Sequence, residues 1–167
     1  MTAPGASRGA VLVRAAGRGA VLGLGGVAAM TLSEKIEQVV TARPNSHVPG
    51  RALLTLLRHR PADEAQPVLA NHAMHWGTGA LLGTMRGVWA AVGVRGPRAS
   101  LVHTVVRLAF DQTVENTTGV GAPPRTWPRR EEAVDVLHKA VYAFATALLT
   151  DRLISPTLQS RAGKTSH

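Results

Sequence analysis

The chain has 167 residues and a formal net charge of +9, from 19 Lys and Arg against 10 Asp and Glu. This length suits one domain, and the 17% of charged residues lies below the roughly 25% of soluble domains. Because cysteine is absent, disulfides, thiolate catalysis, Cys-ligated zinc and iron–sulfur clusters are excluded. The 4% of aromatic residues argues against a protein that stacks nucleic-acid bases, so no nucleic-acid partner is predicted.

Hydrophobic periodicity predicts an all-α protein with four long helices and almost no strand. We expect these helices at residues 10–40, 68–94, 98–117 and 129–154. The turn at Gly96-Pro97 separates the second helix from the third, and Ser155-Pro156 ends the fourth. The expected topology is up-down-up-down.

Two proline-rich connectors join the helices. The first, over residues 41–67, is polar and holds a predicted short helix at 51–60, and the second, over 119–128, is predicted to be a rigid loop. The expected domain covers residues 9–155, with disordered ends at 1–8 and 156–167.

Glycine content favours a bilayer over water as the surroundings of these helices. The second helix alone contains five glycines: Gly77, Gly79, Gly83, Gly87 and Gly93. Each would cost about 1 kcal/mol relative to alanine in a water-exposed helix, whereas small residues let helices approach closely in a membrane. No segment has eighteen uncharged apolar residues in a row, so a soluble four-helix bundle is the alternative.

The membrane interpretation carries further expectations. Gly79, Gly83 and Gly87 form a small-xxx-small stripe, or glycine zipper, through which the chain could form a homo-oligomer. The basic start followed by the apolar stretch 19–32 imitates a signal peptide, but helical periodicity continues to residue 40 and favours a retained first helix. Counting Lys and Arg on the two sides of this multi-pass arrangement gives no orientation, but the short basic turn at 93–98 favours both termini in the cytoplasm.

The sequence also contains a candidate internal repeat of two helix–loop–helix units. His72, Trp76 and Gly77 in the second helix match His138, Tyr142 and Ala143 in the fourth, at the same spacing. Such duplication is common in membrane bundles, and chance similarity in a biased composition is the alternative.

Polar residues gather where four helix ends are expected to meet. In an up-down-up-down fold, the end of helix one, the start of helix two, the end of helix three and the start of helix four lie on one side. These places hold Glu34/Glu37, His72/His75, Asp111/Glu115 and Asp135/His138. Members of each pair are three or four residues apart and share a helix face, so the groups are predicted to point towards one another.

Three interpretations of this cluster stay open. In the first, Asp111, Glu115, His75 and His138 perform acid–base catalysis or proton transfer. In the second, a divalent metal is bound, with Glu34, His72 and Asp135 as candidate ligands. In the third, the groups only satisfy one another, as Arg107–Asp111 or Glu34–His72 pairs would.

Several motifs together resemble the YagU-like small bacterial inner-membrane proteins. They are the glycine-rich first helix ending in Ala29-Met30-Thr31, the His75-Trp76-Gly77 of the second helix, the late acid of the third, the Pro123-Pro124 loop and the His138-x-x-x-Tyr142 of the fourth. The resemblance implies four transmembrane helices, residence in the plasma membrane and an association with acid tolerance, without an assigned reaction. This chain departs from the pattern by charges inside its helices, notably Arg107, Asp111, Asp135 and Lys139. That departure leaves room for a membrane-embedded enzyme acting on a lipid or isoprenoid-like substrate.

Overall fold

A computed structural model describes residues 7–158 of the chain, and within that range it contains helices and no strand. The α-helices are α1 (Arg8–Thr41), α2 (Val48–Leu56), α3 (Val68–Ala91), α4 (Gly96–Thr117) and α5 (Arg129–Leu153), and a short 3-10 helix, η1, covers Pro124–Thr126. The all-α prediction is confirmed, and the four long helices lie within a few residues of their expected positions.

Local chemistry explains where these helices begin and end. The Ser7 hydroxyl accepts a hydrogen bond from the Ala10 amide at 3.2 Å and caps α1, which ends where Ala42 takes a left-handed conformation with φ of 57°. Proline occupies the first turn of α2 and of α4, where its missing N–H has no partner to lose. Pro128 precedes α5, whose first turn carries Glu131 and Glu132, as the positive end of a helix dipole favours.

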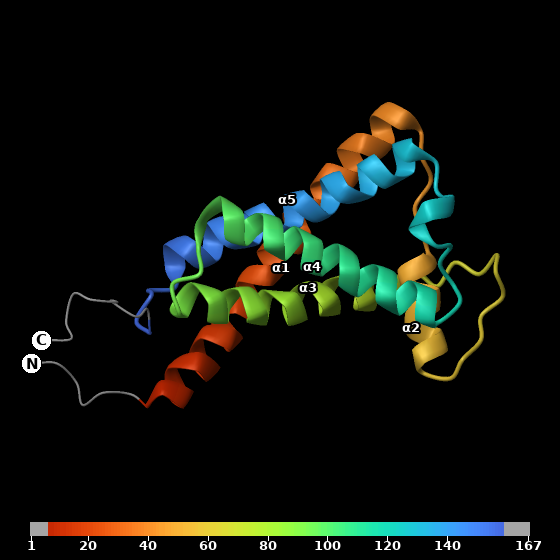
Figure 1. Ribbon diagram of the computed structural model, residues 1–167. Helices are drawn as coiled ribbons and strands as arrows, with labels where there is room; N and C mark the ends of the chain where they lie inside the picture. The colour runs from red at the N-terminus through yellow and green to blue at the C-terminus, as the bar shows by residue number, and fades with distance from the viewer. Residues whose placement is uncertain (1–6, 159–167) are drawn as a thin grey trace, which may run out of the picture.

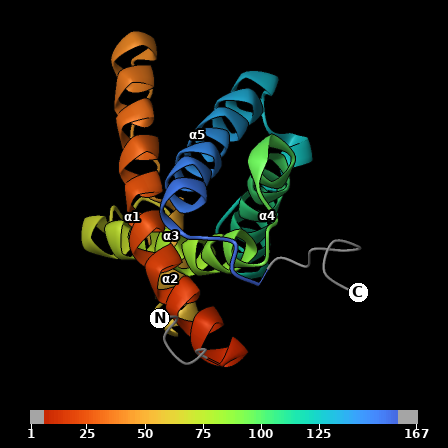
Figure 2. The same ribbon diagram turned by 90° about the vertical axis from the view of Figure 1, so that its left-hand side faces the viewer.

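The long helices do not form the regular bundle that the up-down-up-down prediction implied. Helix α1 crosses over α3 instead of running alongside it, and α5 lies against α1 on one side and α4 on the other (Figures 1 and 2). Helices α3 and α4 share few contacts although a short turn joins them. Helix α2 packs between the start of α3 and the end of α4.

Glycines at the crossing explain this geometry. A Cβ atom on Gly19 would lie 2.3 Å from the Gly83 carbonyl oxygen, and one on Gly83 would lie 2.5 Å from the Gly19 carbonyl oxygen. On Gly87 it would lie 2.3 Å from the Ala15 oxygen, and on Gly79 it would meet the Val27 side chain at 2.0 Å. The two backbones therefore touch only because these positions lack side chains. The glycine zipper expected to join copies of the chain packs against α1 within one chain, and homo-oligomerisation stays a prediction.

Each long helix contains a stretch in which every exposed residue is apolar and every ionisable residue is buried or half-buried. We call these four stretches the apolar belt, and they cover residues 19–34, 73–91, 99–112 and 133–151. The exposed positions are filled by residues such as Leu24, Leu81, Val105 and Phe144. The interior, in contrast, holds Arg86, His103, Arg107 and His138. The polarity of a soluble bundle is thus inverted along the belt.

Two of the helices, α1 and α5, are long and apolar enough to cross a membrane by length and composition. Helices α3 and α4 are of similar length but carry His75, Arg86, Arg107 and Asp111 on their inward faces, which lowers their mean hydropathy. Composition alone is weak evidence, since buried core helices and signal sequences pass the same test.

An ion pair locks the end of the molecule where α1 begins and α5 ends. Arg86, which is 0% exposed, pairs with Asp151 at 2.7 Å, and the other oxygen of Asp151 accepts from the Gly96 amide at 3.0 Å. Arg95 donates to the carbonyl oxygens of Ala90, Asp151 and Ile154. The turn between α3 and α4 is thereby fixed to the last turn of α5, whose free carbonyls the arginine satisfies.

The two halves of the candidate repeat agree in helix packing but differ in the burial of the matched residues. Helices α1 and α3 pack together, as do α4 and α5, but His72 and Trp76 are exposed where His138 and Tyr142 are buried. The repeat stays a prediction.

Most of the ends expected to be disordered lie outside the described residues. Of their described part, Ser7 caps α1 and the Leu158 amide donates to the Ala91 oxygen at 2.9 Å.

Candidate functional site

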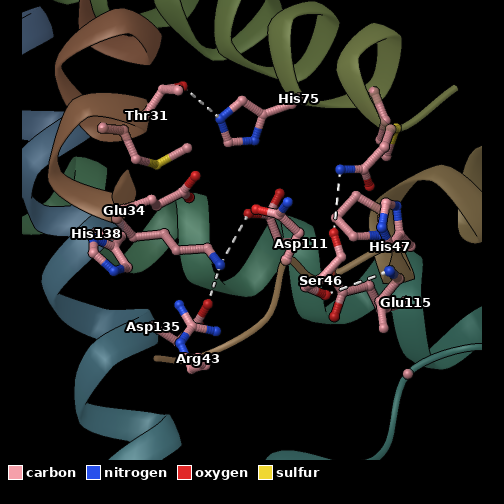
Figure 3. A pocket seen from close by; sticks show the side chains of 18 of the residues that line it. Thr31, Glu34, Arg43, Ser46, His47, His75, Asp111, Glu115, Asp135 and His138 are labelled. Carbon is pink, nitrogen blue, oxygen red and sulfur yellow. Dashed lines mark hydrogen bonds and ion pairs between the residues drawn. The ribbon is translucent and has the colours of Figure 1, made fainter. Parts of the chain in front are cut away.

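A cavity of about 730 Å³ lies where the second half of α1, the first half of α3, the second half of α4 and the first half of α5 meet. This is the side on which the sequence predicted the polar residues to gather. The two connectors cover it, with residues from Arg43 to Pro49 on one flank and Gly121, Ala122, Trp127 and Pro128 on the other. We call this cavity the chamber, and Figure 3 shows it from close by.

All the residues of the predicted polar cluster line the chamber except Glu37, which binds Arg43 beside it. Those that line it are Glu34 from α1, His72 and His75 from α3, Asp111 and Glu115 from α4, and Asp135 and His138 from α5. In Figure 3, Glu34, His75, Asp111 and Asp135 project from four different helices towards a shared space. The predicted convergence is confirmed, whereas the role of each residue stays a prediction.

Two cations occupy the centre of the site and neutralise two of the candidate carboxylates. Arg107 Nε lies 2.9 Å from Asp111 Oδ2, as predicted, and Lys139 Nζ lies 3.5 Å from the same oxygen and also pairs with Asp135. The Arg107 guanidinium is 4.8 Å from the centre of the Tyr142 ring, within cation–π range. Asp111 is therefore held by two cations and anchors both of them in the chamber wall.

The histidines differ in how firmly they are held. His138 accepts from or donates to the Ser33 hydroxyl through Nδ1 at 3.1 Å, and its Nε2 lies 3.8 Å from Glu37 Oε2. His75 Nε2 lies 3.3 Å from the Thr31 hydroxyl. His72 is exposed at the chamber edge, and the Glu34–His72 pair expected from the sequence does not form. Both ring nitrogens of His138 thus face groups of α1.

Glu34 and Glu115 are the two candidate carboxylates whose side chains make no ion pair or hydrogen bond within the described residues. Glu115 lies in the last turn of α4, beyond the apolar belt, beneath the Gly119–Gly121 turn whose Gly121 amide bonds to the Glu115 carbonyl at 3.1 Å. Burial raises the pKa of the Glu115 carboxyl to about 7, against the opposing attraction of Lys139. It is therefore the candidate best suited to exchange a proton near neutral pH.

The metal hypothesis finds no preformed geometry. Among residues 7–158, no group of three or more His, Asp or Glu side chains lies close enough together to hold a metal ion. The candidate ligands Glu34, His72 and Asp135 line different parts of the chamber wall, and Asp135 is already paired with Lys139.

Sequence reasoning did not place two basic residues, Lys139 and Arg43, in the site. Lys139 was recognised only as an unusual charge, although its four-residue spacing from Asp135 was a usable signal for an ion pair, whereas the Arg107–Asp111 pair was expected. Arg43 binds Glu37 at 3.0 Å and approaches Glu131 at 3.7 Å. No local pattern connects Arg43 to α5, because the connector brings it there only in the folded chain.

Comparison with protein-family models, with curated proteins and with solved structures finds no match to this chain. Membership of the YagU-like proteins therefore stays a prediction.

Proposed function

We propose that this chain is an integral membrane protein whose four long helices enclose a polar chamber that binds the head group of an amphiphilic molecule. The observation that carries the proposal is the apolar belt, in which apolar residues face outwards and ionisable residues face inwards. Apolar atoms are common on any protein surface. A complete absence of exposed charge along stretches of all four long helices, however, is typical of contact with lipid.

Two of the four stretches of the belt match the thickness of a bilayer, and the other two, 19–34 and 99–112, are shorter, at about 24 and 21 Å for a rise of 1.5 Å per residue. The longest stretches, 73–91 in α3 and 133–151 in α5, extend about 28 Å at a rise of 1.5 Å per residue, close to the roughly 30 Å of the hydrocarbon core. Apart from Glu34 at the end of the α1 stretch, the Lys, Arg, Asp and Glu residues inside the belt are paired, as Arg86–Asp151 and Arg107–Asp111 illustrate, which is the usual condition for charged groups at this depth.

The orientation follows from the charges on either side of the belt. The side on which α1 begins and α5 ends carries a single described acid, Asp151, which Arg86 neutralises. Its exposed or half-buried bases are Arg8, Arg14, Arg18, Arg95, Arg98 and Arg152. The connector side carries at least as many bases, Lys35, Arg43, Arg51, Arg58, Arg60, Arg125, Arg129 and Arg130, so the count of Lys and Arg alone does not orient the protein. The short turn at 93–98, which carries bases and no acid, favours cytoplasmic termini, with the chamber opening towards the opposite side.

The chamber suits an amphiphile because its wall is mixed. Its volume of about 730 Å³ lies within the usual range for small-molecule sites. Met30, Met74, Val48 and Val68 contribute apolar surface beside the carboxylates and imidazoles. Glu115 is the residue we assign to acid–base chemistry on the bound molecule, because its carboxyl is unpaired and its pKa of about 7 allows both protonation states.

Cell fractionation tests the membrane part of the proposal. The full chain should sediment with membranes, resist extraction by alkaline carbonate and dissolve only with detergent. Recovery in the supernatant of lysed cells without detergent would refute it.

Native mass spectrometry of the detergent-purified protein tests the chamber. Met74→Trp places a bulky ring in the chamber without changing a charge, whereas Leu101→Trp places the same ring on the exposed face of α4. Wild type and Leu101→Trp should retain a bound amphiphile that Met74→Trp loses. Equal retention by both variants would place the amphiphile outside the chamber.

A second candidate function, a response to acid, is favoured by Glu115 as well. A carboxyl with a pKa of about 7 changes charge when the surrounding pH falls from neutral to acid, which agrees with the acid-tolerance association implied by the resemblance. Deleting the gene and restoring it with Glu115→Gln tests this function. Restored survival at low pH by wild type but not by Glu115→Gln would support it, and equal restoration by both would refute it.

A further inference from the structure

We propose that the head group bound in the chamber is a zwitterion, with an ammonium group held by Glu34 and an anionic oxygen held by Arg107. This inference rests on the proposed function, because it names the class of amphiphile that the chamber binds.

The first argument concerns unused hydrogen-bond acceptors. Of the candidate carboxylates in the chamber, Asp111 and Asp135 are occupied by Arg107 and Lys139. Glu34 and Glu115 have no ion pair or hydrogen bond within the described residues, yet both lie in the chamber wall. Half-buried carboxylates need donors, and a primary ammonium group supplies three.

The second argument concerns an unused donor. Arg107 lines the chamber and is only 2% exposed. Its Nε bonds to Asp111, but its NH1 nitrogen is buried with no acceptor in the described residues. A buried guanidinium nitrogen without an acceptor is costly, and a phosphate or carboxylate oxygen is the partner that arginine geometry suits best.

The third argument is the charge balance of the wall. Four bases line the chamber, Lys35, Arg43, Arg107 and Lys139, against five acids, Glu34, Asp111, Glu115, Glu131 and Asp135. The formal sum is −1 with every carboxyl ionised, and −2 when Glu37, which binds Arg43 from outside the wall, is included. A head group with no net charge therefore fits better than an anionic one, whose extra charge would lie unpaired at low dielectric.

Together these features distinguish among lipids. A primary ammonium offers N–H donors to the Glu34 carboxylate, whereas a quaternary ammonium offers none, and a glycerol head group brings a net negative charge. The chamber should therefore prefer phosphatidylethanolamine over phosphatidylcholine and over phosphatidylglycerol.

The test is a competition measured by native mass spectrometry on the full chain in detergent, with these three lipids added at equal concentration. Loss of charge-assisted hydrogen bonds should weaken phosphatidylcholine and phosphatidylglycerol binding by about tenfold or more relative to phosphatidylethanolamine. Equal or tighter binding of phosphatidylglycerol by the wild-type protein would overturn the proposal without the need for any variant.

Variants then locate the preference. Glu34→Gln should reduce the preference for phosphatidylethanolamine about tenfold, while Glu132→Gln, an exposed position in the first turn of α5 outside the chamber wall, should leave it unchanged. An unchanged preference in Glu34→Gln would also overturn the proposal. In the last part of the experiment, soluble phosphoethanolamine is added to the lipid-bound protein. If it displaces the lipid, the zwitterion site is supported and its ligand is a soluble molecule rather than a lipid.

The outcomes separate this inference from the proposed function. If Met74→Trp and wild type bind no amphiphile at all, the proposed function fails. If wild type retains an amphiphile that is not zwitterionic and Met74→Trp loses it, the proposed function stands and only this inference fails.

Discussion

Adding one methyl group at Gly83 should separate α1 from α3 and destabilise the protein. A Cβ atom there would lie 2.5 Å from the Gly19 oxygen and 2.8 Å from Gly23 Cα, about 0.9 Å short of the 3.4 Å at which ordinary contact begins. Both neighbours are backbone atoms of α1, so no side chain can rotate away. The helices must move apart, and contacts along the crossing are lost.

The expected magnitude combines two opposing effects. Overpacking a close contact costs about 1–3 kcal/mol, and alanine gains up to about 1 kcal/mol over glycine in helix propensity. Gly83→Ala should therefore lose about 1–2 kcal/mol in free energy of unfolding, or roughly 2–8 °C in Tm for a chain of this size. Gly77→Ala lies on the same helix with nothing within 4 Å of its Cβ, so it should be neutral or slightly stabilising.

Thermal unfolding of the two variants in the same detergent, followed by circular dichroism, measures the difference. Equal Tm values for Gly83→Ala and Gly77→Ala would refute the argument that backbone contact fixes the crossing. A double variant with Gly19→Ala should lose more than Gly83→Ala alone, because each new methyl group meets the opposite backbone.

Three further outcomes are expected from the ionisable residues. Burial of Glu115 raises its pKa from 4.5 to about 7 on folding, so the folded state binds the proton more tightly than the unfolded state does. The free energy of unfolding should therefore fall by about 3 kcal/mol as the pH rises from 4.5 through 7. Tm measured against pH should show this loss, and Glu115→Gln should remove it. Asp151→Asn leaves the fully buried Arg86 without its carboxylate and should cost about 3–5 kcal/mol in denaturant unfolding, an expectation that an unchanged midpoint would contradict. Lys139→Met should destabilise the protein because it leaves carboxylates unpaired. In a double-mutant cycle, adding Asp135→Asn should recover about 0.5–3 kcal/mol of that loss. If the two effects simply add, Lys139 and Asp135 do not interact.

Much of the candidate site was predictable because its residues repeat at helical spacing. His103, Arg107, Asp111 and Glu115 are each four residues apart and therefore share one face of α4. Their convergence with groups on three other helices needed only the order of the helices and the short turn at Gly96. These two facts were enough to predict which of these residues line the chamber.

The division of roles among those residues was not predictable in the same way. Asp111 and Glu115 are one helical turn apart on the same face, yet Asp111 binds two cations while Glu115 has none. The difference depends on where Lys139 of α5 lies along α4, which is a matter of packing between helices. Arg43 likewise reaches Glu37 and Glu131 only because the connector folds back over the chamber.

The sequence by itself determined the positions of the helices, their inward polar faces and the side on which those faces meet, because helical periodicity is a local property of the chain. Only the tertiary structure decided that α1 crosses α3, that α3 and α4 separate, and that a chamber of about 730 Å³ is left between the long helices. The crossing depends on backbone-to-backbone contact at Gly19, Gly23 and Gly83. A glycine in a sequence permits another helix to approach closely, but it does not determine which helix approaches or at what angle.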